Sequence, residues 1–440
     1  MDKYMDVKKS RYNIFVPQEN GKYIVFNSLS GAIGIFESDT MERFSSNTLT
    51  NEEMNILIRK GIFVSAATNE LDIINCDRVN GIFSHNRSFR IWPTSACNAR
   101  CYYCFEKGIS PASMTEETAD SLIDFICKLT NEEDTVSIEW FGGEPLMNTG
   151  IIDYISKRIS YILGKKSIPW RASMISNGSL LTLDIVRKMI KLWNVERIQI
   201  TLDGYGEEYN RAKSYLNPIL FNFEKVIHNI RLLLDNGIHV SIRMNYDTVN
   251  YKTLKKLISF LAREFSHEPN ISYYVYPIWN ALGDCKNGFT TTTEADLQLI
   301  DLFEDLVTSG MASAGNLARL QYRKRQCSSC GINNYSVLPN GDILKCSEAF
   351  NCVVGNVFSG IADEVAVAKW TDPGLDDECI CCSYLPLCQG GCRASRVTNM
   401  PRCMAFKKII PELLKWYVVH AGKQQKPSMN GDGNKVNGVR

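Results

Sequence analysis

One loop of this chain reads Cys97-Asn98-Ala99-Arg100-Cys101-Tyr102-Tyr103-Cys104, and it follows the apolar, strand-like stretch Phe89-Arg90-Ile91-Trp92. Three thiolates on one short loop can bind three corners of a [4Fe-4S] cluster, which leaves the fourth iron without a protein ligand. An iron with an open position can bind a substrate or a second cofactor. Structural zinc would need a fourth ligand, and no further Cys or His is close in the sequence. The spacing therefore indicates chemistry rather than scaffolding.

The composition narrows the class of protein. The chain has 440 residues, with 49 Lys plus Arg against 48 Asp plus Glu, so nothing supports a nucleic-acid-binding or basic membrane-surface protein. No signal-peptide pattern is present, and no stretch approaches the roughly 20 apolar residues of a membrane helix. We expect a cytoplasmic protein, in which 16 cysteines indicate bound metal rather than disulfides.

Residues 83–310 alternate predicted strands with amphipathic helices. This pattern predicts an α/β fold with a parallel sheet, either an incomplete barrel or an open doubly wound sheet. The predicted strands are 89–92, 136–141, 172–176, 197–202, 240–245 and 271–276, and the predicted helices are 115–129, 151–163, 181–192, 222–236 and 251–263. Functional residues of such folds gather at the C-terminal ends of the strands. The cysteine loop, Gly142-Gly143-Glu144, Ser176-Asn177-Gly178 and Asp203-Gly204 follow the first four strands in turn.

The two flanking regions differ from this repeat. Residues 1–82 predict a winged helix-turn-helix outline, in which a helix opens at Thr50 with a capping box to Glu53. The strands of this module are expected at 12–16, 23–27, 32–36 and 61–64, with a further short helix near 40–44. Residues 311–408 are cysteine-rich and expected to be irregular, and residues 409–440 are expected to form a C-terminal helix and a disordered tail.

Taken together, the loop cysteines, the aromatic Tyr103 before the last of them and the strand-end motifs resemble the radical SAM superfamily. The resemblance implies a partial (β/α)6 TIM barrel over residues 83–310. It implies that Cys97, Cys101 and Cys104 hold a [4Fe-4S] cluster whose open iron chelates S-adenosyl-L-methionine. In that family an electron from the reduced cluster cleaves the cofactor, and the resulting 5′-deoxyadenosyl radical abstracts hydrogen from a C–H bond.

The same resemblance implies a set of cofactor-binding residues around the strand ends. These are Tyr103, Gly142, Gly143, Glu144, Ser176, Asn177, Asp203, Arg243 and Asn245. One departure is visible, because many relatives carry His-Asp and then Arg after Leu-Asp-Gly, whereas this chain reads Tyr209-Asn210-Arg211-Ala212-Lys213. The role of that segment is open.

Ten cysteines lie between Cys327 and Cys403, and their spacing resembles the SPASM extension of radical SAM enzymes that act on peptides and proteins. The extension implies two auxiliary [4Fe-4S] clusters, and so three clusters in all. The outer one would be held by Cys379, Cys382, Cys388 and Cys403, and the inner one by Cys330, Cys346 and Cys392, with Cys327 as the fourth ligand. Whether Cys327 is a ligand stays open. The remaining cysteines, Cys76, Cys127, Cys285, Cys352 and Cys381, are expected to be ordinary buried thiols.

In front of such a core, residues 1–82 resemble a RiPP recognition element, in which the leader of a precursor peptide adds a strand to the small sheet. A structural subdomain or a DNA-binding winged helix are the alternatives, and Glu42, Glu52 and Glu53 argue against DNA. The resemblance thus implies a maturase that forms an oxidative cross-link in a ribosomally made precursor peptide, supplied with electrons by a flavodoxin or ferredoxin. A thioether from Cys to carbon is the first expectation, and a carbon–carbon link is nearly as favoured.

Two other functions stay open. An anaerobic sulfatase maturase that forms formylglycine shares the core and the cysteine pattern, but such enzymes tend to carry Asp after the cysteine matching Cys346, where this chain has Ser347. The other is a non-catalytic, peptide-binding metal scaffold. The identity of the peptide, the residues joined and the catalytic base do not follow from the sequence.

Overall fold

The structure is a computed structural model that describes residues 6–279, 288–289, 292–313, 320–324, 327–372, 374–397 and 406–424. Six parallel strands form its centre, each paired with the one before it in the chain. They are β6 (Asn86–Thr94), β7 (Thr135–Gly142), β8 (Trp170–Ser176), β9 (Val195–Thr201), β10 (His239–Tyr246) and β11 (Ile271–Pro277). All six predicted strands are confirmed. The strand order never reverses, as it would in a doubly wound sheet, so the incomplete barrel is the correct alternative.

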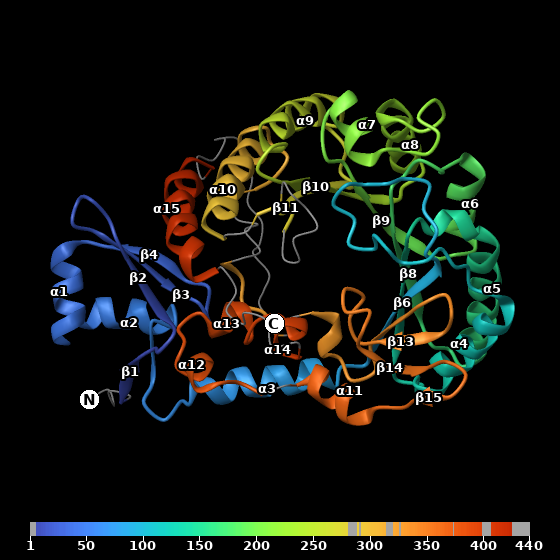
Figure 1. Ribbon diagram of the computed structural model, residues 1–440. Coiled ribbons are helices and arrows are strands. Elements are labelled where there is room, and N and C mark those ends of the chain that lie inside the picture. The colour runs from blue at the N-terminus through green and yellow to red at the C-terminus, as the bar shows by residue number, and fades with distance from the viewer. Residues whose placement is uncertain are drawn as a thin grey trace, which may run out of the picture.

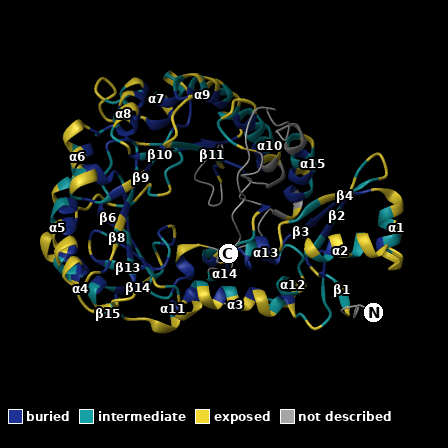
Figure 2. Ribbon diagram, turned by 180° about the vertical axis from the view of Figure 1, so that it is seen from behind, coloured by how far each residue is buried: buried dark blue, intermediate teal, exposed yellow. Residues whose placement is uncertain are grey.

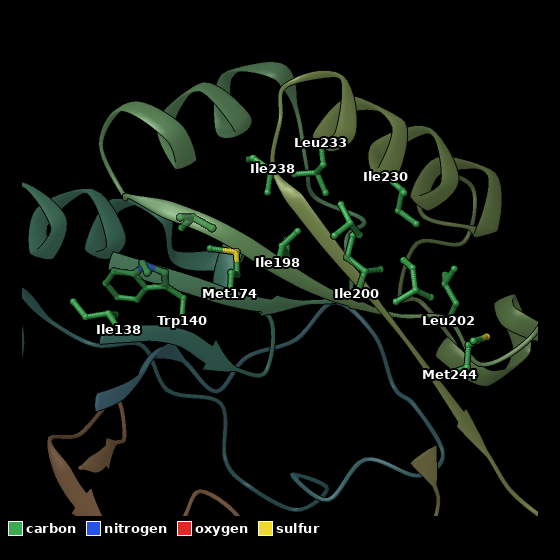
Figure 3. Packing of buried hydrophobic residues seen from close by; sticks show 14 of the residues in the cluster. Ile138, Trp140, Met174, Ile198, Ile200, Leu202, Ile230, Leu233, Ile238 and Met244 are labelled. Carbon is green, nitrogen blue, oxygen red and sulfur yellow. The ribbon is translucent and has the colours of Figure 1, made fainter. Parts of the chain in front are cut away.

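The helices that connect these strands cover the outer face of the curved sheet, and the inner face surrounds an open centre (Figure 1). The five predicted helices appear as α4 (Glu116–Lys128), α5 (Thr149–Lys165), α6 (Leu183–Lys191), α8 (Phe223–Asp235) and α9 (Tyr251–Glu264). Alternate strand residues such as Trp140, Met174 and Ile198 lie in the apolar layer between sheet and helices, together with Leu233 of α8 (Figure 3). Side chains on either side of them in the strand point to the other face. The sheet therefore has a polar interior available for a site.

The sheet continues into the cysteine-rich segment. Strand β12 (Tyr335–Val337) pairs in parallel with β6, and β13 (Asp342–Leu344), β14 (Val353–Asn356) and β15 (Gly360–Ile361) follow antiparallel, which gives a ten-stranded sheet. The expectation of an irregular segment is wrong for this part. These strands have only two to four residues, too few for a period of two to be recognised.

Short helices complete the C-terminal half. They are η4 (Ser328–Cys330), α11 (Glu364–Thr371), α12 (Asp377–Ile380), α13 (Leu385–Cys388) and α14 (Arg393–Val397), with the longer α10 (Thr292–Thr308) before them and α15 (Phe406–Gln424) after them. The predicted disordered tail beyond α15 lies outside the described residues. In the described ranges no helix is both long and apolar enough to cross a membrane.

The N-terminal region forms a three-stranded antiparallel sheet of β2 (Asn13–Pro17), β3 (Tyr23–Asn27) and β4 (Ile33–Phe36). Helices α1 (Ser38–Ser46) and α2 (Asn51–Arg59) follow, and the predicted capping box of Thr50 and Glu53 opens α2. The apolar cluster of Val25, Phe36, Phe44, Leu57, Ile62 and Phe63 joins this sheet to these helices. Helix α15 contacts β2 and β3 as well, so the small sheet also packs against the rest of the molecule (Figure 1).

Two features of this region differ from expectation. The strand expected at 61–64 is β5 (Phe63–Ser65), and it pairs with β1 (Val7–Lys9) rather than with the three-stranded sheet. Helix α3 (Glu70–Ile82) was not predicted, because its buried positions include Glu70 and Arg78 and so give no apolar period. This helix runs along the molecule beside the cysteine-rich segment (Figures 1 and 2).

Candidate active site

The cysteine loop begins where β6 ends, and two glycines of the next strand end pack directly against its backbone. The Gly143 N–H donates to the Thr94 carbonyl at 3.2 Å and the Glu144 N–H to the Ala96 carbonyl at 2.9 Å. A Cβ atom on Gly142 would lie 2.4 Å from the Thr94 carbonyl oxygen, and one on Gly143 would lie 2.4 Å from that of Ala96. Only glycine therefore fits at either position, and the pair fixes the start of the loop against β7.

The three loop thiols are partly buried side by side. Burial, together with the neighbouring Glu144 carboxylate and the two other loop cysteines, raises the pKa of Cys97 to about 12. Burial likewise raises the pKa of Cys104 to about 11. The protein alone thus disfavours the ionised thiols, and a bound metal would supply the missing positive charge.

The donor set fits an iron–sulfur cluster better than a single ion. Among the described residues, no three Cys, His, Asp or Glu side chains already converge on one point at ion-binding distance. Thiolates of a [4Fe-4S] cluster bind separate irons, so they need not converge in that way. The Ala99 N–H also lies 3.4 Å from the Cys97 Sγ, as a donor to a thiolate would.

Glu144 is fully buried, and its carboxylate braces the end of β8. It accepts hydrogen bonds from the Ser176 hydroxyl and the Asn177 N–H, both at 2.8 Å, and from the Leu146 N–H at 3.2 Å. Burial raises the pKa of Glu144 to about 7 in spite of these donors. The carboxylate is therefore occupied within the protein, while the residue joins the second and third strand ends.

The third strand end is in turn tied to the cysteine loop. The side-chain amide of Asn177 donates to the side-chain oxygen Oδ1 of Asn98 at 2.8 Å, and the side-chain amide of Asn98 donates to the Ser179 hydroxyl at 2.9 Å. The sequence prediction placed Glu144, Ser176 and Asn177 near one cofactor, and the structure brings all three beside the loop.

The fourth strand end carries a buried ion pair. The Asp203 carboxylate is 1% exposed and lies 2.8 Å from the Lys213 ammonium, which also lies 2.8 Å from the Tyr103 hydroxyl. The Tyr103 hydroxyl donates to Asp203, and the Asn245 N–H lies 3.3 Å from the same carboxylate. Sequence reasoning assigned roles to Tyr103, Asp203 and Asn245 but left out Lys213.

Lys213 lies on the short helix α7 (Glu207–Lys213) and is 3% exposed. Burial lowers the pKa of its ammonium, but the adjacent Asp203 carboxylate outweighs burial, so the pKa is raised. Lys213 is therefore a fixed positive charge beside the cysteine loop. The available signal was its place in the segment 209–213, where relatives carry an arginine.

The fifth strand end presents a polar pair. The Arg243 guanidinium donates to the Asn245 side-chain oxygen at 2.7 Å and lies over the Tyr276 ring, 4.2 Å from its centroid. Arg243 is half-buried, and Tyr276 on β11 is 43% exposed. These side chains form an amphipathic wall next to the buried Asp203 group.

A cavity of about 880 Å³ is lined by inner-face residues of β6 to β10 and by the cysteine-rich segment. Arg90 crosses it, with 2.5 Å between its Nε and a Glu139 carboxylate oxygen and a further hydrogen bond to the Ser347 hydroxyl. Cys327, Cys346 and Cys392 line the same cavity. The inner face of the sheet thus connects a charged interior to three cysteines far apart in the chain.

The fourth cysteine of that predicted inner set is Cys330, which is fully buried. A hydrogen bond from the Cys327 thiol lowers the pKa of Cys330, and the Arg393 guanidinium contributes, with its Nε 3.1 Å from the Cys330 Sγ. Cys327 and Cys330 are therefore neighbours, and Cys346 and Cys392 line the same cavity as Cys327. The four cysteines of the predicted inner set thus lie at or beside one cavity.

The predicted outer set is described in part. Cys379, Cys382 and Cys388 lie on or beside α12 and α13, whereas Cys403 lies outside the described residues. The Tyr384 N–H donates to the Cys382 Sγ at 3.4 Å, and an Arg396 nitrogen lies 3.1 Å from the Cys379 Sγ.

The other cysteines do not all match the expectation of buried thiols. That expectation is wrong for Cys76, which lies on an exposed face of α3, and for Cys381, at the exposed end of α12. Cys127 and Cys352 are half-buried, and Cys285 lies outside the described residues.

Comparison with known proteins places this site in a family context. Residues 91–261 match the model of the Radical SAM superfamily. The radical SAM cyclopropyl synthase TigE of Paramaledivibacter caminithermalis is 24% identical, covering 53% of this chain and 52% of TigE. A probable GTP 3′,8-cyclase of Saccharolobus islandicus is 26% identical, covering 39% of this chain and 51% of its own length. The chain thus spans about half the length of the curated relatives that it matches.

Solved structures share the fold over more of the chain. A structure of anSMEcpe with bound AdoMet has a TM-score of 0.59 at 15% identity, covering 77% of this chain and 99% of that one. Streptococcus suis SuiB bound to precursor peptide SuiA has a TM-score of 0.52 at 15% identity, covering 91% of this chain and 100% of SuiB. At these identities the likeness establishes the fold alone.

Proposed function

We propose, from the radical SAM domain at residues 91–261, that this chain is a radical S-adenosyl-L-methionine enzyme that modifies a peptide. One observation carries the proposal: three partly buried thiols, Cys97, Cys101 and Cys104, share one loop at the C-terminal end of the first barrel strand. A [4Fe-4S] cluster held there, with S-adenosyl-L-methionine on its open iron, would supply a 5′-deoxyadenosyl radical.

The residues around the loop would position that cofactor. Gly142 and Gly143 keep the second strand end close to the loop, and Glu144 holds Ser176 and Asn177 in place from behind. The partly exposed Asn177 and Arg243 offer polar groups to the cofactor, with Asn245 behind Arg243. Tyr103 and Asp203 would support the cofactor site from inside the protein and not by direct contact, because the Asp203 carboxylate already pairs with Lys213.

We assign residues 1–82 to a leader-binding RiPP recognition element, 83–310 to the radical SAM partial barrel, 311–408 to a SPASM domain and 409–440 to a C-terminal helix and tail. The antiparallel sheet with β4 at its edge supports the first assignment, because a peptide can add a strand to a free edge. SuiB, solved with the precursor peptide SuiA, aligns with 91% of this chain and supports a peptide partner. A flavodoxin or ferredoxin would supply electrons.

The reaction that we favour is a cross-link in the precursor peptide, a thioether first and a carbon–carbon link second. Either bond removes two hydrogens from the peptide, so an electron must leave the site. Two auxiliary [4Fe-4S] clusters would accept it, the inner on Cys327, Cys330, Cys346 and Cys392 and the outer on Cys379, Cys382, Cys388 and Cys403. The cavity that joins the inner cysteines to the barrel interior supports this route.

Formation of formylglycine is the second candidate, because an anaerobic sulfatase maturase would share the expected core and cysteine pattern. Ser347 argues against formation of formylglycine. This hydroxyl follows Cys346, is 3% exposed and is held by Arg90, so the carboxylate base expected there is absent from this position.

The test is the production of 5′-deoxyadenosine by anaerobically purified protein. Replacing Cys97, Cys101 and Cys104 by Ala should abolish it, while Cys127→Ala on α4, outside the loop and both auxiliary cysteine sets, should leave it unchanged. Continued production by the triple variant would refute the site. Protein without iron and sulfide would instead support a non-catalytic scaffold.

The reaction class is tested by the mass of the peptide. The probe is the product of a short open reading frame beside the gene, incubated with the enzyme, cofactor and reductant. A mass lower by two hydrogens is expected for a cross-link and also for a serine oxidised to formylglycine, so a cross-link additionally requires fragmentation that shows two joined residues. An unchanged mass would contradict the proposal.

A further inference from the structure

Helix α14, only five residues long, carries two arginines directly after Cys392. Arg393 is 2% exposed and Arg396 is 7% exposed, although arginine is rarely buried unless it is paired. Because the guanidinium stays protonated at any pH the protein meets, both positions are permanent positive charges in the interior.

Each arginine contacts a thiol of a different cysteine set. The Arg393 Nε lies 3.1 Å from the Cys330 Sγ, in the proposed inner set, and an Arg396 terminal nitrogen lies 3.1 Å from the Cys379 Sγ, in the proposed outer set. Positions three apart on a helix are neighbours on one face. Helix α14 therefore bridges the two sets with one charged donor for each.

The two charges are not equally compensated within the protein. Arg396 lies 3.5 Å from the Asp376 carboxylate and donates to the carbonyls of Gly374 and Gly390. In contrast, no carboxylate among the described residues lies within salt-bridge distance of Arg393, and its buried Nη1 has no hydrogen-bond partner there. A buried cation with an unused donor beside a thiol indicates a missing anion at that site.

A reduced cluster would provide such an anion. When a thiolate-bound [4Fe-4S]²⁺ cluster gains one electron, it gains one negative charge, and hydrogen bonds and positive charges at its sulfurs favour that form. Because the two arginines contact different sets, each should act mainly on one cluster.

We propose that Arg393 and Arg396 are positioning residues that raise the reduction potentials of the inner and outer auxiliary clusters, respectively. The pair makes both clusters electron acceptors by stabilising their one-electron reduced forms. The inference rests on the proposed function, since it requires the two auxiliary clusters.

The experiment is a redox titration followed by electron paramagnetic resonance. It uses the full chain with Cys97, Cys101 and Cys104 replaced by Ala, so that only the auxiliary clusters contribute signals. In this background Arg393→Gln should make reduction of the inner cluster at least tenfold less favourable, which lowers its reduction potential by about 59 mV for one electron. The reduction potential of the outer cluster should stay unchanged. Arg396→Gln should do the reverse. Lysine at either position keeps the positive charge, so the reduction potential of the neighbouring cluster should stay close to that of the parent.

Arg87→Gln is the matched control. Arg87 is also buried, 8% exposed, but its Nε lies 2.9 Å from the Asp134 carboxylate, and among the described residues it has no hydrogen bond to a cysteine. Its replacement should move neither potential, whereas a purely structural role for buried arginines would affect all three glutamine variants alike.

The outcomes separate the two proposals. A triple alanine background without about eight irons per chain would refute the auxiliary clusters themselves, and the inference with them. Full iron with potentials that neither glutamine variant shifts would refute the inference alone. If a glutamine variant loses iron, the lysine variant at the same position is decisive. A lysine variant with the reduction potential of the parent supports the proposal. A lysine variant that keeps its iron but is reduced at least tenfold less favourably than the parent refutes it.

Discussion

At the scale of single residues, the centre of the candidate site is held by contacts rather than by exposed ligands. Asp203 receives hydrogen bonds from Tyr103, Lys213 and the Asn245 N–H; Asp203, Lys213 and Asn245 are buried, and Tyr103 is half-buried. Two desolvated opposite charges stabilise one another, but either one alone is costly to bury. The Lys213–Asp203 pair is therefore a point where one substitution should disturb the fourth strand end.

We predict that Lys213→Met lowers the free energy of unfolding of the metal-free protein by about 3–5 kcal/mol, because it leaves the Asp203 carboxylate buried and unpaired. Lys213→Arg, which keeps the charge, should cost less. Urea unfolding measured by circular dichroism gives both values.

The control is Lys188→Met. The Lys188 ammonium also lies 2.7 Å from a carboxylate, that of Asp153, but it is 43% exposed. Exposed pairs contribute about 0–1 kcal/mol, so this change should be small. If both methionine variants lost the same free energy of unfolding, the buried Lys213–Asp203 pair would contribute no more to stability than an exposed pair.

The same residues show how far sequence reasoning reaches. Cys97 was recognised because three cysteines at that spacing indicate a cluster, whereas Gly142 and Glu144 were recognised through the resemblance to a known family. Lys213 was not, because its value depends on helix α7 folding back over Asp203, and nothing in its local sequence specifies that partner. The hydrogen bonds that the Glu144 carboxylate accepts could not be predicted either, because two of its donors, Ser176 and Asn177, lie at the end of β8, far along the chain.

At the scale of elements, strand β4 has the geometry of an edge that can accept a further strand. It pairs only with β3 in the described sheet, where the Asn27 N–H donates to the Ala32 carbonyl. Antiparallel pairs alternate between bonded and non-bonded positions, so the backbone groups of Ile33 and Ile35 face the free side. Ile35 is also 52% exposed, which leaves its surroundings open to a peptide.

We predict that Ile35→Pro weakens binding of the leader peptide at least tenfold, because proline removes the N–H that faces the free edge without removing a bond to β3. Fluorescence anisotropy with the labelled leader would measure the change. Ile35→Val keeps the N–H and should bind as the parent does. Unchanged binding by the proline variant would place the leader elsewhere.

The elements also differ in how well the sequence specifies them. The barrel strands and helices were identified because each is long enough to show its period, as with the buried alternation of β7. Strands β12 to β15 and helix α3 were missed. Their short length or buried charges remove the pattern, and only pairing with β6 or packing against the cysteine-rich segment gives them their structure.

At the scale of the whole molecule, the N-terminal region is joined to the cysteine-rich segment. Tyr12, Ile74 and Leu385 form a small core, with Cys379 packed against it. The Arg11 guanidinium donates to the Ile380 carbonyl and the Ser28 hydroxyl to the Ser383 carbonyl, each at 2.5 Å. The sequence suggested separate modules, because contacts between residues so far apart in the chain leave no local trace. The structure instead makes the proposed leader-binding region a support for the proposed outer cluster.

This arrangement predicts different consequences for two aromatic substitutions of similar cost. Tyr12 is fully buried in the shared core, whereas Phe44 is 4% exposed within the N-terminal cluster, against Phe36 and Phe63. Truncating a buried aromatic side chain to Ala costs about 3–5 kcal/mol.

Tyr12→Ala should loosen the segment of Cys379 and Cys382 and release iron from the outer cluster at lower urea than in the parent. Phe44→Ala should impair leader binding but leave iron release unchanged. Iron released during urea titration, read with a chromogenic chelator, measures the difference, and equal release by both variants would mean that the two regions are not coupled.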